Sequence, residues 1–136
     1  MTTTTSGDCL NVGFLQSAFN DQGSEKIASI NVDGNSTMND KIFLLSKDEV
    51  ENSLYGFAND TSRKRKITDY SKVVGVTYSD RNGQDKPGNG IWWLRTPNTQ
   101  NIDRALVVGV DGDIREDFDV NESYFGVVPA LCLNNE

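Results

Sequence analysis

The side chains that commonly perform catalysis are unevenly represented in this chain, which contains 20 Asp or Glu residues, two cysteines and no histidine. The lack of histidine excludes Ser–His and Cys–His nucleophile pairs, histidine-ligated zinc and the commonest general base. Paired carboxylates for glycoside hydrolysis stay open as an alternative, because any two of the acids can converge in a fold. Since no spacing singles out such a pair, we predict a protein that is not an enzyme and has no cofactor.

Three clusters of acidic and amide residues have the composition of a calcium loop. In Asp33–Asn39 the oxygen ligands alternate as in an EF-hand, but Met38 replaces the glycine and Leu44 the closing glutamate. Asp80–Gly90 also lacks a closing ligand, and the acids of Asp111–Asp119 are more typical of a solvated hairpin. We predict no metal site, and weak calcium binding by the third cluster stays an open alternative.

The net charge of −7 argues against the phosphate backbone of nucleic acid as a partner. Residues 61–86 are the exception, with seven Lys or Arg against three Asp. They include the run Arg63–Lys66, which resembles a nucleic-acid patch but in an acidic chain is more often an exposed loop that contacts an acidic neighbour. No apolar run approaches the ~20 residues that span a bilayer, so we also predict no membrane insertion.

The two cysteines, Cys9 and Cys132, lie near opposite ends of the chain. We predict two unpaired thiols that pack as small hydrophobic side chains. A disulfide between them is the alternative, and it requires that the ends meet and that the chain is exported.

The chain is organised around Gly90–Pro97, where two indoles, two aliphatic side chains and a cation occupy five consecutive positions. In a strand, Trp92 and Leu94 share one face while Trp93 and Arg95 share the other. Both faces carry large apolar groups, which predicts a strand buried on both sides, with both indoles in the core. Arg95 then needs a carboxylate or carbonyl partner, which indicates a structural role.

The region before this strand reads as short helices and loops. Residues 1–8 form a flexible lead, and helical spacing predicts a helix over Cys9–Phe19 that Asn20–Gly23 ends. Ser24–Val32 fits either a helical turn or a strand. The polar stretch Ala58–Asn89 is long enough that we expect it to be both functional and partly structured.

Two further elements are expected between these segments. The apolar run Ile42–Leu45 predicts a buried strand. Ser46 with Glu49 forms a capping box, which opens a helix that continues through Leu54 towards Phe57.

The last third of the chain alternates as a β-meander. Strands are predicted over Leu106–Val110 and Ile114–Val120, joined by the hairpin signal Asp111-Gly112. A final strand is predicted over Phe125–Leu133, with Pro129 as a break or edge position. With the tryptophan strand, this gives at least four strands.

Five motifs occur in order along residues 9–133: Leu10-Asn11 with Phe14-Leu15 and Ala18-Phe19, then Asp40–Ser46, Thr68–Ser71, Trp92–Pro97 and Gly126–Leu131. Their order resembles an uncharacterised bacterial and phage domain family, usually met as a C-terminal module of larger surface-associated proteins. The family's motifs read WWLRSP and GVRPAL. Here Thr96 replaces the serine and Val128 replaces the arginine.

The tryptophan strand, the meander and the closing motif are also similar to the C-type-lectin-like fold, in the branch of formylglycine-generating enzymes and variable proteins of diversity-generating retroelements. The resemblance implies an α+β fold, with two helices packed on a small, mostly antiparallel sheet, long loops, and termini close together in a single domain over residues 9–136. Enzymes of that branch use a cysteine pair in the C-terminal half. Only Cys132 lies there, so the resemblance does not extend to their activity.

In such variable proteins the diversified positions lie between the WLR and closing motifs. The residues at corresponding places here, which we expect to contact a ligand, are Ile102, Arg104, Arg115, Asp117, Phe118, Tyr124 and Phe125. Phe118 and Phe125 also fit core positions, and that alternative stays open.

The sequence and the resemblance together predict a non-enzymatic recognition module for a protein or glycan ligand. The rigid frame is expected to include Phe43, Leu44, Trp92, Trp93 and Arg95. We expect it in a bacterial or phage surface protein, at the cell surface, secreted or in a phage particle. Diversification of its contact residues by a retroelement is part of this expectation. The alternatives are a carbohydrate-active enzyme with paired carboxylates and a structural or assembly domain.

Overall fold

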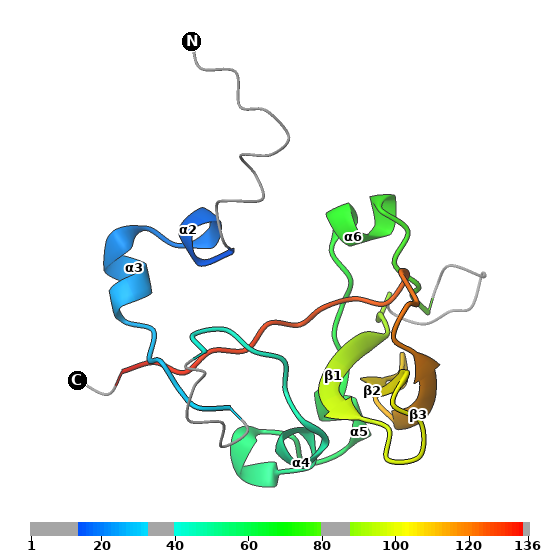
Figure 1. The fold of residues 1–136 in the computed structure, drawn as a ribbon. Helices are drawn as coiled ribbons and strands as arrows, with labels where there is room; N and C mark the ends of the chain where they lie inside the picture. The colour runs from blue at the N-terminus through cyan, green and yellow to red at the C-terminus, as the bar shows by residue number, and fades with distance from the viewer. Residues whose placement is uncertain (1–13, 33–39, 80–87, 135–136) are drawn as a thin grey trace. The chain divides into compact units, whose positions relative to one another are not determined.

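The structure, a computed structural model, describes residues 14–32, 40–79 and 88–134 (Figure 1). The chain divides into two compact units, one from Met1–Phe43 with Ala130–Glu136 and one from Leu44–Pro129. The elements are α2 (Phe14–Ala18), α3 (Asp21–Glu25), α4 (Lys47–Val50), the 3-10 turn η1 (Ser53–Tyr55), α5 (Asp60–Arg63), α6 (Asp69–Val73), β1 (Trp92–Pro97), β2 (Arg104–Val108) and β3 (Ile114–Asp119). Short helices with one antiparallel sheet make an α+β protein, as the sequence predicted.

The first unit joins the two ends of the described chain. Ile27 forms a β-bridge with Leu133, and the Ala28 amide donates to the Cys132 carbonyl at 2.8 Å. Ile27 is buried by this pairing. Within the same unit, Phe43 forms a bridge with Ala130. Residues more than a hundred positions apart in sequence therefore lie side by side.

The predicted helix and turn of this unit are partly present. Helical structure covers Phe14–Ala18, and the earlier predicted residues lie outside the described ranges. Asn20 ends that helix and also begins α3, because its side chain accepts a hydrogen bond from the Gly23 amide at 2.8 Å. Asn20–Gly23 is thus a helix start as well as a stop.

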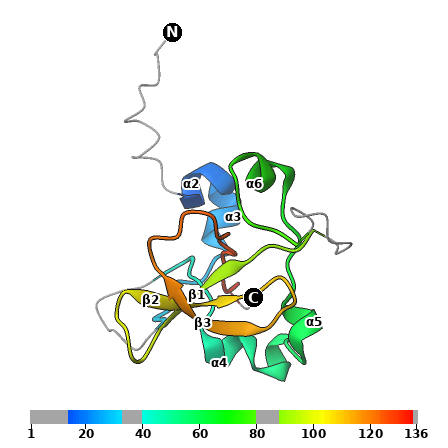
Figure 2. The same ribbon diagram turned by 90° about the vertical axis from the view of Figure 1, so that its right-hand side faces the viewer.

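The second unit is built on the antiparallel sheet β1-β2-β3, with α4 and α5 on one side of it and α6 on the opposite side (Figure 2). β1 is buried on both faces, which confirms the prediction made for the tryptophan strand. Trp92 and Leu94, each 2% exposed, point to one face, while Trp93 is half-buried on the other with the preceding Ile91.

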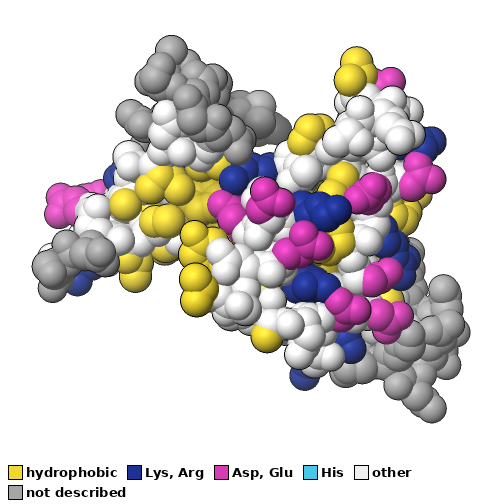
Figure 3. Space-filling view, turned by 90° about the horizontal axis from the view of Figure 1, so that it is seen from below, with side chains coloured by type: hydrophobic (Ala, Val, Ile, Leu, Met, Phe, Trp, Pro, Cys, Tyr) yellow, Lys and Arg dark blue, Asp and Glu magenta, His cyan; other side chains and the backbone are white. Residues whose placement is uncertain are grey.

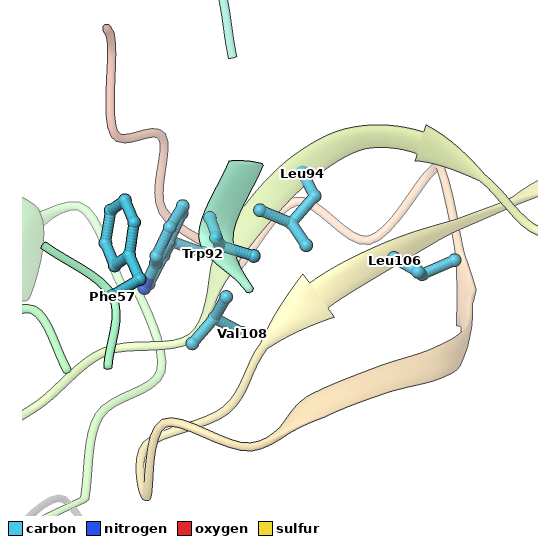
Figure 4. Close-up of a cluster of buried hydrophobic side chains, with 6 residues drawn as sticks. Phe57, Trp92, Leu94, Leu106 and Val108 are labelled. Carbon is cyan, nitrogen blue, oxygen red and sulfur yellow. The ribbon is translucent and has the colours of Figure 1, made fainter. Parts of the chain in front are cut away.

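The larger core cluster lies on the Trp92 face of the sheet (Figure 4). It consists of Trp92 and Leu94 from β1, Leu106 and Val108 from β2, and Val50 and Phe57 from the helical segment. Side chains of this size each contribute about 1.5–3 kcal/mol when fully buried. The cluster therefore attaches α4 and the chain after η1 to the sheet.

A β-bulge in β3 places apolar side chains on both sheet faces. Ile114 pairs with Val108 and Phe118 with Ala105, so two residues of β3, Glu116 and Asp117, oppose one residue of β2. The extra residue reverses the alternation. Ile114 therefore packs in the Trp92 cluster, whereas Phe118 packs on the opposite face.

The predicted capping box at Ser46 is confirmed, and it also holds Arg95. The Ser46 hydroxyl accepts from the Glu49 amide at 3.2 Å, and the Glu49 carboxylate accepts from the Ser46 amide at 2.7 Å. The same carboxylate accepts two hydrogen bonds from Arg95, at 2.6 and 3.1 Å, and the Leu44 carbonyl accepts a third at 2.8 Å. Both kinds of partner expected for Arg95 are present.

The hairpin predicted at Asp111-Gly112 is confirmed, and α5 packs directly against its turn. Gly112 has a φ of 86°, and an added Cβ atom would lie 1.7 Å from the Asp60 carbonyl oxygen. Arg63 Nε donates to the Gly112 carbonyl at 2.8 Å. Only glycine satisfies both the backbone conformation and the close approach.

Three predicted elements are wrong. Ile42–Leu45 is half-buried and forms only the bridge at Phe43, because the Leu44 and Leu45 carbonyls accept hydrogen bonds from Arg95. The last predicted strand, Phe125–Leu133, forms isolated bridges to three different segments, so the described meander has three strands. The helix from Ser46 ends at Val50, and Leu54 is 90% exposed in η1, while Phe57 reaches the core.

Other predicted boundaries and residues can also be compared with the structure. Val110 and Val120 lie just beyond the ends of β2 and β3. The polar stretch Ala58–Asn89 contains α5 and α6, so its partial structure is confirmed. Cys132 is exposed rather than packed as a small hydrophobic group. Cys9, residues 1–8 and the calcium-like sequence Asp33–Asn39 lie outside the described residues.

The Glu49–Arg95 pair predicts acid-sensitive stability. Burial alone would raise the pKa of Glu49, but hydrogen bonds from Arg95 and Ser46 together lower it below its ordinary value of 4.5. A lowered folded-state pKa stabilises the fold above that ordinary value, and this contribution is lost as the pH falls through the folded pKa. Glu49→Gln should lower the free energy of unfolding by about 1–3 kcal/mol at neutral pH, with a smaller difference from wild type near pH 3.

Urea unfolding at both pH values measures this effect. Glu51→Gln is the matched control, because Glu51 is exposed at the end of α4. Its effect should stay within about 0.5 kcal/mol. Equal losses for the two variants would contradict the structural role of Glu49.

A second prediction concerns the hairpin turn. Gly56 and Gly112 have nearly the same φ, 88° and 86°, but of the two only Gly112 has an atom within 4 Å of the position that an alanine Cβ would occupy. Gly56→Ala should therefore destabilise by about 1–2 kcal/mol through backbone strain alone. Gly112→Ala should destabilise by more than about 3 kcal/mol, because it also displaces the Asp60 backbone. Thermal unfolding of the two variants tests the difference, and equal melting temperatures would show that the turn does not pack on α5.

Candidate functional site

The aromatic side chains of the meander gather on the sheet face opposite Trp92. The ring of Phe125 lies at the centre, 5.2 Å from Trp93, 4.9 Å from Phe118 and 5.2 Å from Tyr124, measured between ring centroids. The two contacts with Phe118 and Tyr124 are edge-to-face, an arrangement that stabilises aromatic pairs beyond their burial. We call these four residues the aromatic cluster.

The members of the aromatic cluster differ in exposure. Phe125 is 8% exposed and packs with Ile91 and Val107, so it is a core residue rather than a surface contact. Phe118 is half-buried against the same group. Tyr124 is 43% exposed, and its hydrogen bond with Glu122 raises the pKa of the phenol. Of the three predicted aromatic contacts, Tyr124 offers the most surface to a ligand.

Arg104 and Asp117 meet at the end of the sheet, together with Asp119. Arg104 Nε donates to Asp119 at 2.9 Å, and its Nη1 atom donates to Asp117. The hydrogen bond to Asp119, followed by the charge of Asp117, raises the pKa of Arg104. In the space-filling view, acidic and basic side chains lie interleaved over part of the face that is shown (Figure 3). An exposed charge network of this kind contributes specificity more than stability.

The remaining predicted contacts lie elsewhere on the meander. Ile102 is 91% exposed in the loop between β1 and β2. Arg115 is near the β2–β3 turn, where its Nε donates to Asp113 at 2.7 Å. The structure thus brings Phe118, Tyr124 and Phe125 together, and Arg104 with Asp117, while Ile102 and Arg115 stand apart from these two groups.

The basic run Arg63–Lys66 is mostly not the exposed loop that the sequence indicated. Arg63 is buried and donates to the carbonyls of Gly112 and Val50, and it pairs with Asp60, the acidic neighbour that was expected. Arg65 is half-buried, with its guanidinium 5.4 Å from the ring centroid of Phe57 and 5.9 Å from that of Trp92.

A small open pocket of about 100 Å³ lies beside Arg65. It is lined by Arg65, Lys66, Ile67, Thr68, Ser71, Val76, Gly90, Ile91, Trp92 and Gly126 to Val128. Ligand sites for drug-sized molecules have volumes of roughly 300–1,000 Å³, so this pocket fits a single side chain or a small ion. Within residues 14–32, 40–79 and 88–134, no three of the Cys, Asp and Glu side chains gather closely enough to hold a metal ion.

Sequence reasoning missed three residues of these groups. Asp119 pairs with Arg104 because the bulge shifts the register by one position. Glu122 is close to Tyr124 two residues away, a spacing that gave no signal by itself. Arg65 was grouped with its charged neighbours, although a cation between the core residues Phe57 and Trp92 is a cation–π arrangement.

The chain was also compared with known proteins. Residues 8–135 match the family described as "Domain of unknown function (DUF6273)". Neither the curated proteins nor the solved structures show a significant match to the chain. None of the helices in the described parts of the chain is long and apolar enough to cross a membrane.

The division between core and surface on the meander can be tested directly. Phe125→Ala should lower the free energy of unfolding by about 3–5 kcal/mol, because it leaves a cavity in the centre of the aromatic cluster. Ile102→Ala should change it by less than about 0.5 kcal/mol. Urea unfolding of both variants measures the difference. A small effect of Phe125→Ala would mean that this ring lies at the surface.

Proposed function

This chain belongs to the family described as a domain of unknown function (DUF6273), and from its geometry we propose that it is a non-enzymatic recognition module. The ligand is a protein or a glycan, and it contacts side chains presented by the meander loops. The observation that carries the proposal is the contrast on one small sheet between the buried side chains of β1 and the exposed side chains near its ends. Trp92 is 2% exposed, whereas Ile102 is 91% and Tyr124 43% exposed.

Three properties of the exposed residues support a recognition role. Ile102 is a large apolar side chain that nothing in the fold requires at the surface. Tyr124 provides an aromatic ring and a hydroxyl, and Arg104 provides a guanidinium fixed by two carboxylates. Tyrosine and arginine are enriched among residues that dominate binding energy, because they offer area and hydrogen bonds at low entropic cost.

The frame beneath these residues is rigid. Arg95 makes three hydrogen bonds to α4 and the segment before it, and the hairpin turn is clamped to α5 through Gly112. Phe43 and Leu44 are half-buried and contribute less than Val50, Phe57, Leu106 and Val108. Substitution of loop side chains on such a frame changes the contact surface without changing the fold, which is what a variable binding protein requires.

We extend the proposal to the fold family and the setting. A C-type-lectin-like fold is supported by the short helices, the antiparallel meander and the pairing of Ile27 with Leu133, which brings the two chain ends together. A role in a bacterial or phage surface protein, with diversification by a retroelement, follows from the motif resemblance. Both statements are proposals that rest on the sequence motifs as well as the geometry.

The proposal favours recognition over glycoside hydrolysis for a geometric reason. A glycosidase encloses the sugar between its two carboxyl groups. In the described residues, Glu49 is held by Arg95, and Asp117 and Asp119 are held by Arg104 on the exposed end of the sheet. The pocket of about 100 Å³ is too small to enclose a sugar ring with its hydroxyl groups, and a larger open pocket of about 600 Å³ beside α3 is lined by one carboxylate, Glu25, rather than a pair.

A glycan array and a panel of immobilised bacterial surface proteins test this function. We expect saturable binding without release of reducing sugar. A Tyr124→Ala and Arg104→Ala double variant should weaken binding by roughly thirtyfold or more, since a single residue that dominates an interface contributes about 2 kcal/mol or more. Its melting temperature should fall much less than that of Phe125→Ala, because Tyr124 is 43% exposed and the ion pairs of Arg104 are with exposed carboxylates.

Lys47→Ala is the matched control, since Lys47 is also a surface cation in a salt bridge, with Glu116 at 3.0 Å, but lies on α4. Release of sugar from any glycan that binds, or unchanged binding by the double variant, would overturn the proposal.

A further inference from the structure

Three consecutive cations, Lys64, Arg65 and Lys66, differ from the other cations described in the second unit. Each of the others has a carboxylate partner within 4 Å: Lys47, Arg63, Lys72, Arg95, Arg104 and Arg115. Within the described residues, no carboxylate pairs with the three consecutive cations. In a chain with a net charge of −7, acids to neutralise them are abundant. Their unpaired charge is therefore a local feature of this part of the described surface.

Arg65 is held in position while part of its guanidinium stays unused. Its Nη1 atom donates to the carbonyls of Ser62 and Lys64, at 2.9 and 2.8 Å. Its planar group lies over Phe57 and Trp92. The Nε and Nη2 atoms donate no hydrogen bond to the described residues. A guanidinium fixed in this way loses little conformational entropy when it binds an anion through its remaining donors.

The pocket beside Arg65 combines these donors with apolar walls. Arg65 and Lys66 are its charged lining residues, and no acidic side chain of the described residues lines it. Thr68 and Ser71 add hydroxyl groups, with their oxygen atoms 2.8 Å apart. The aliphatic lining residues include Val76, Val127 and Val128, and Val127 is 61% exposed. The pocket thus combines a positive charge with aliphatic side chains.

We propose that this pocket binds an acidic side chain of a partner polypeptide, whose neighbouring aliphatic residue packs on Val127. The carboxylate accepts hydrogen bonds from Arg65 and forms an ion pair with Lys66. The volume of about 100 Å³ suits one carboxylate side chain. This site lies apart from Ile102 and Arg104, so the proposal does not depend on the function assigned to the meander loops.

The lining favours a peptide over the other anionic ligands. Sugars stack on exposed aromatic faces, but the exposed wall here is aliphatic, and the indole of Trp92 is buried. Nucleic acid requires a run of cations along its backbone, and the net charge of −7 opposes that. An acidic peptide with aliphatic residues complements both the charged and the aliphatic lining residues of the pocket.

Fluorescence anisotropy with a labelled peptide of glutamate, glycine and leucine tests the site, with a matched peptide that has glutamine in place of glutamate. Only the glutamate peptide should bind, and added salt should weaken it. Lys66→Ala should weaken binding roughly two- to fivefold, the range expected for an exposed ion pair. Arg65→Lys should weaken it about tenfold, because lysine lacks the planar fork.

Amide chemical shifts locate the site independently of these variants. Addition of the glutamate peptide should move the signals of Ser71, Gly90 and Gly126, which line the pocket. Lys47→Ala removes the same charge from α4, and Ile102→Ala removes a meander contact, so both should leave the peptide affinity unchanged.

Several results would overturn the proposal. One is equal binding of the glutamine peptide, and another is an equal effect of Lys47→Ala and Lys66→Ala. Shifts confined to residues outside the pocket would have the same meaning. Binding of polygalacturonate through Arg65 and Lys66, without binding of the peptide, would show that the pocket takes acidic sugars instead.

Discussion

Burial of the Trp92 indole is the constraint on which the second unit depends. A tryptophan that is 2% exposed must satisfy its ring N–H, and the Arg63 carbonyl accepts that hydrogen bond at 3.3 Å. Arg63 is itself buried, and its guanidinium donates to the carbonyls of Val50 and Gly112. Buried hydrogen bonds therefore link the indole of β1 to α5, and Arg63 of α5 in turn to α4 and the hairpin turn. Helices of four or five residues would not be stable alone, and this network explains how they persist.

The same constraint leaves the opposite face of the sheet to the aromatic cluster. Trp93 cannot share a face with Trp92, because adjacent side chains of a strand alternate. The bulge at Glu116 and Asp117 then turns Phe118 towards Trp93, and Phe125 fills the space between them. The sheet has an apolar cluster on each side. The exposed contact residues Ile102 and Tyr124 are thereby separated from the residues that hold the fold.

Local patterns in the sequence predicted the parts of this structure that depend on neighbours in sequence. The capping box at Ser46, the turn at Gly112 and the doubly buried strand at Trp92 each have a signal within a few residues. The bulge in β3 has no such signal. The pairing of Arg104 with Asp119 and the position of Phe118 could therefore not be predicted from the sequence. The run Ile42–Leu45 looked like a strand because its composition is apolar, but the carbonyl groups of Leu44 and Leu45 accept hydrogen bonds from Arg95, about fifty residues away. The environment of Arg65 was also missed, because its aromatic neighbours Phe57 and Trp92 come from two separate segments.

The bridge between Ile27 and Leu133 has a consequence for the order of folding. Closing a chain segment of that length carries a large entropic penalty, and the bridge forms only after Leu133 has left the ribosome. The Phe43–Ala130 bridge of the same unit closes a shorter segment, and once it has formed the closure that remains for Ile27 and Leu133 becomes short. The first unit is therefore expected to assemble last during synthesis, and to be the first to open when the native protein fluctuates.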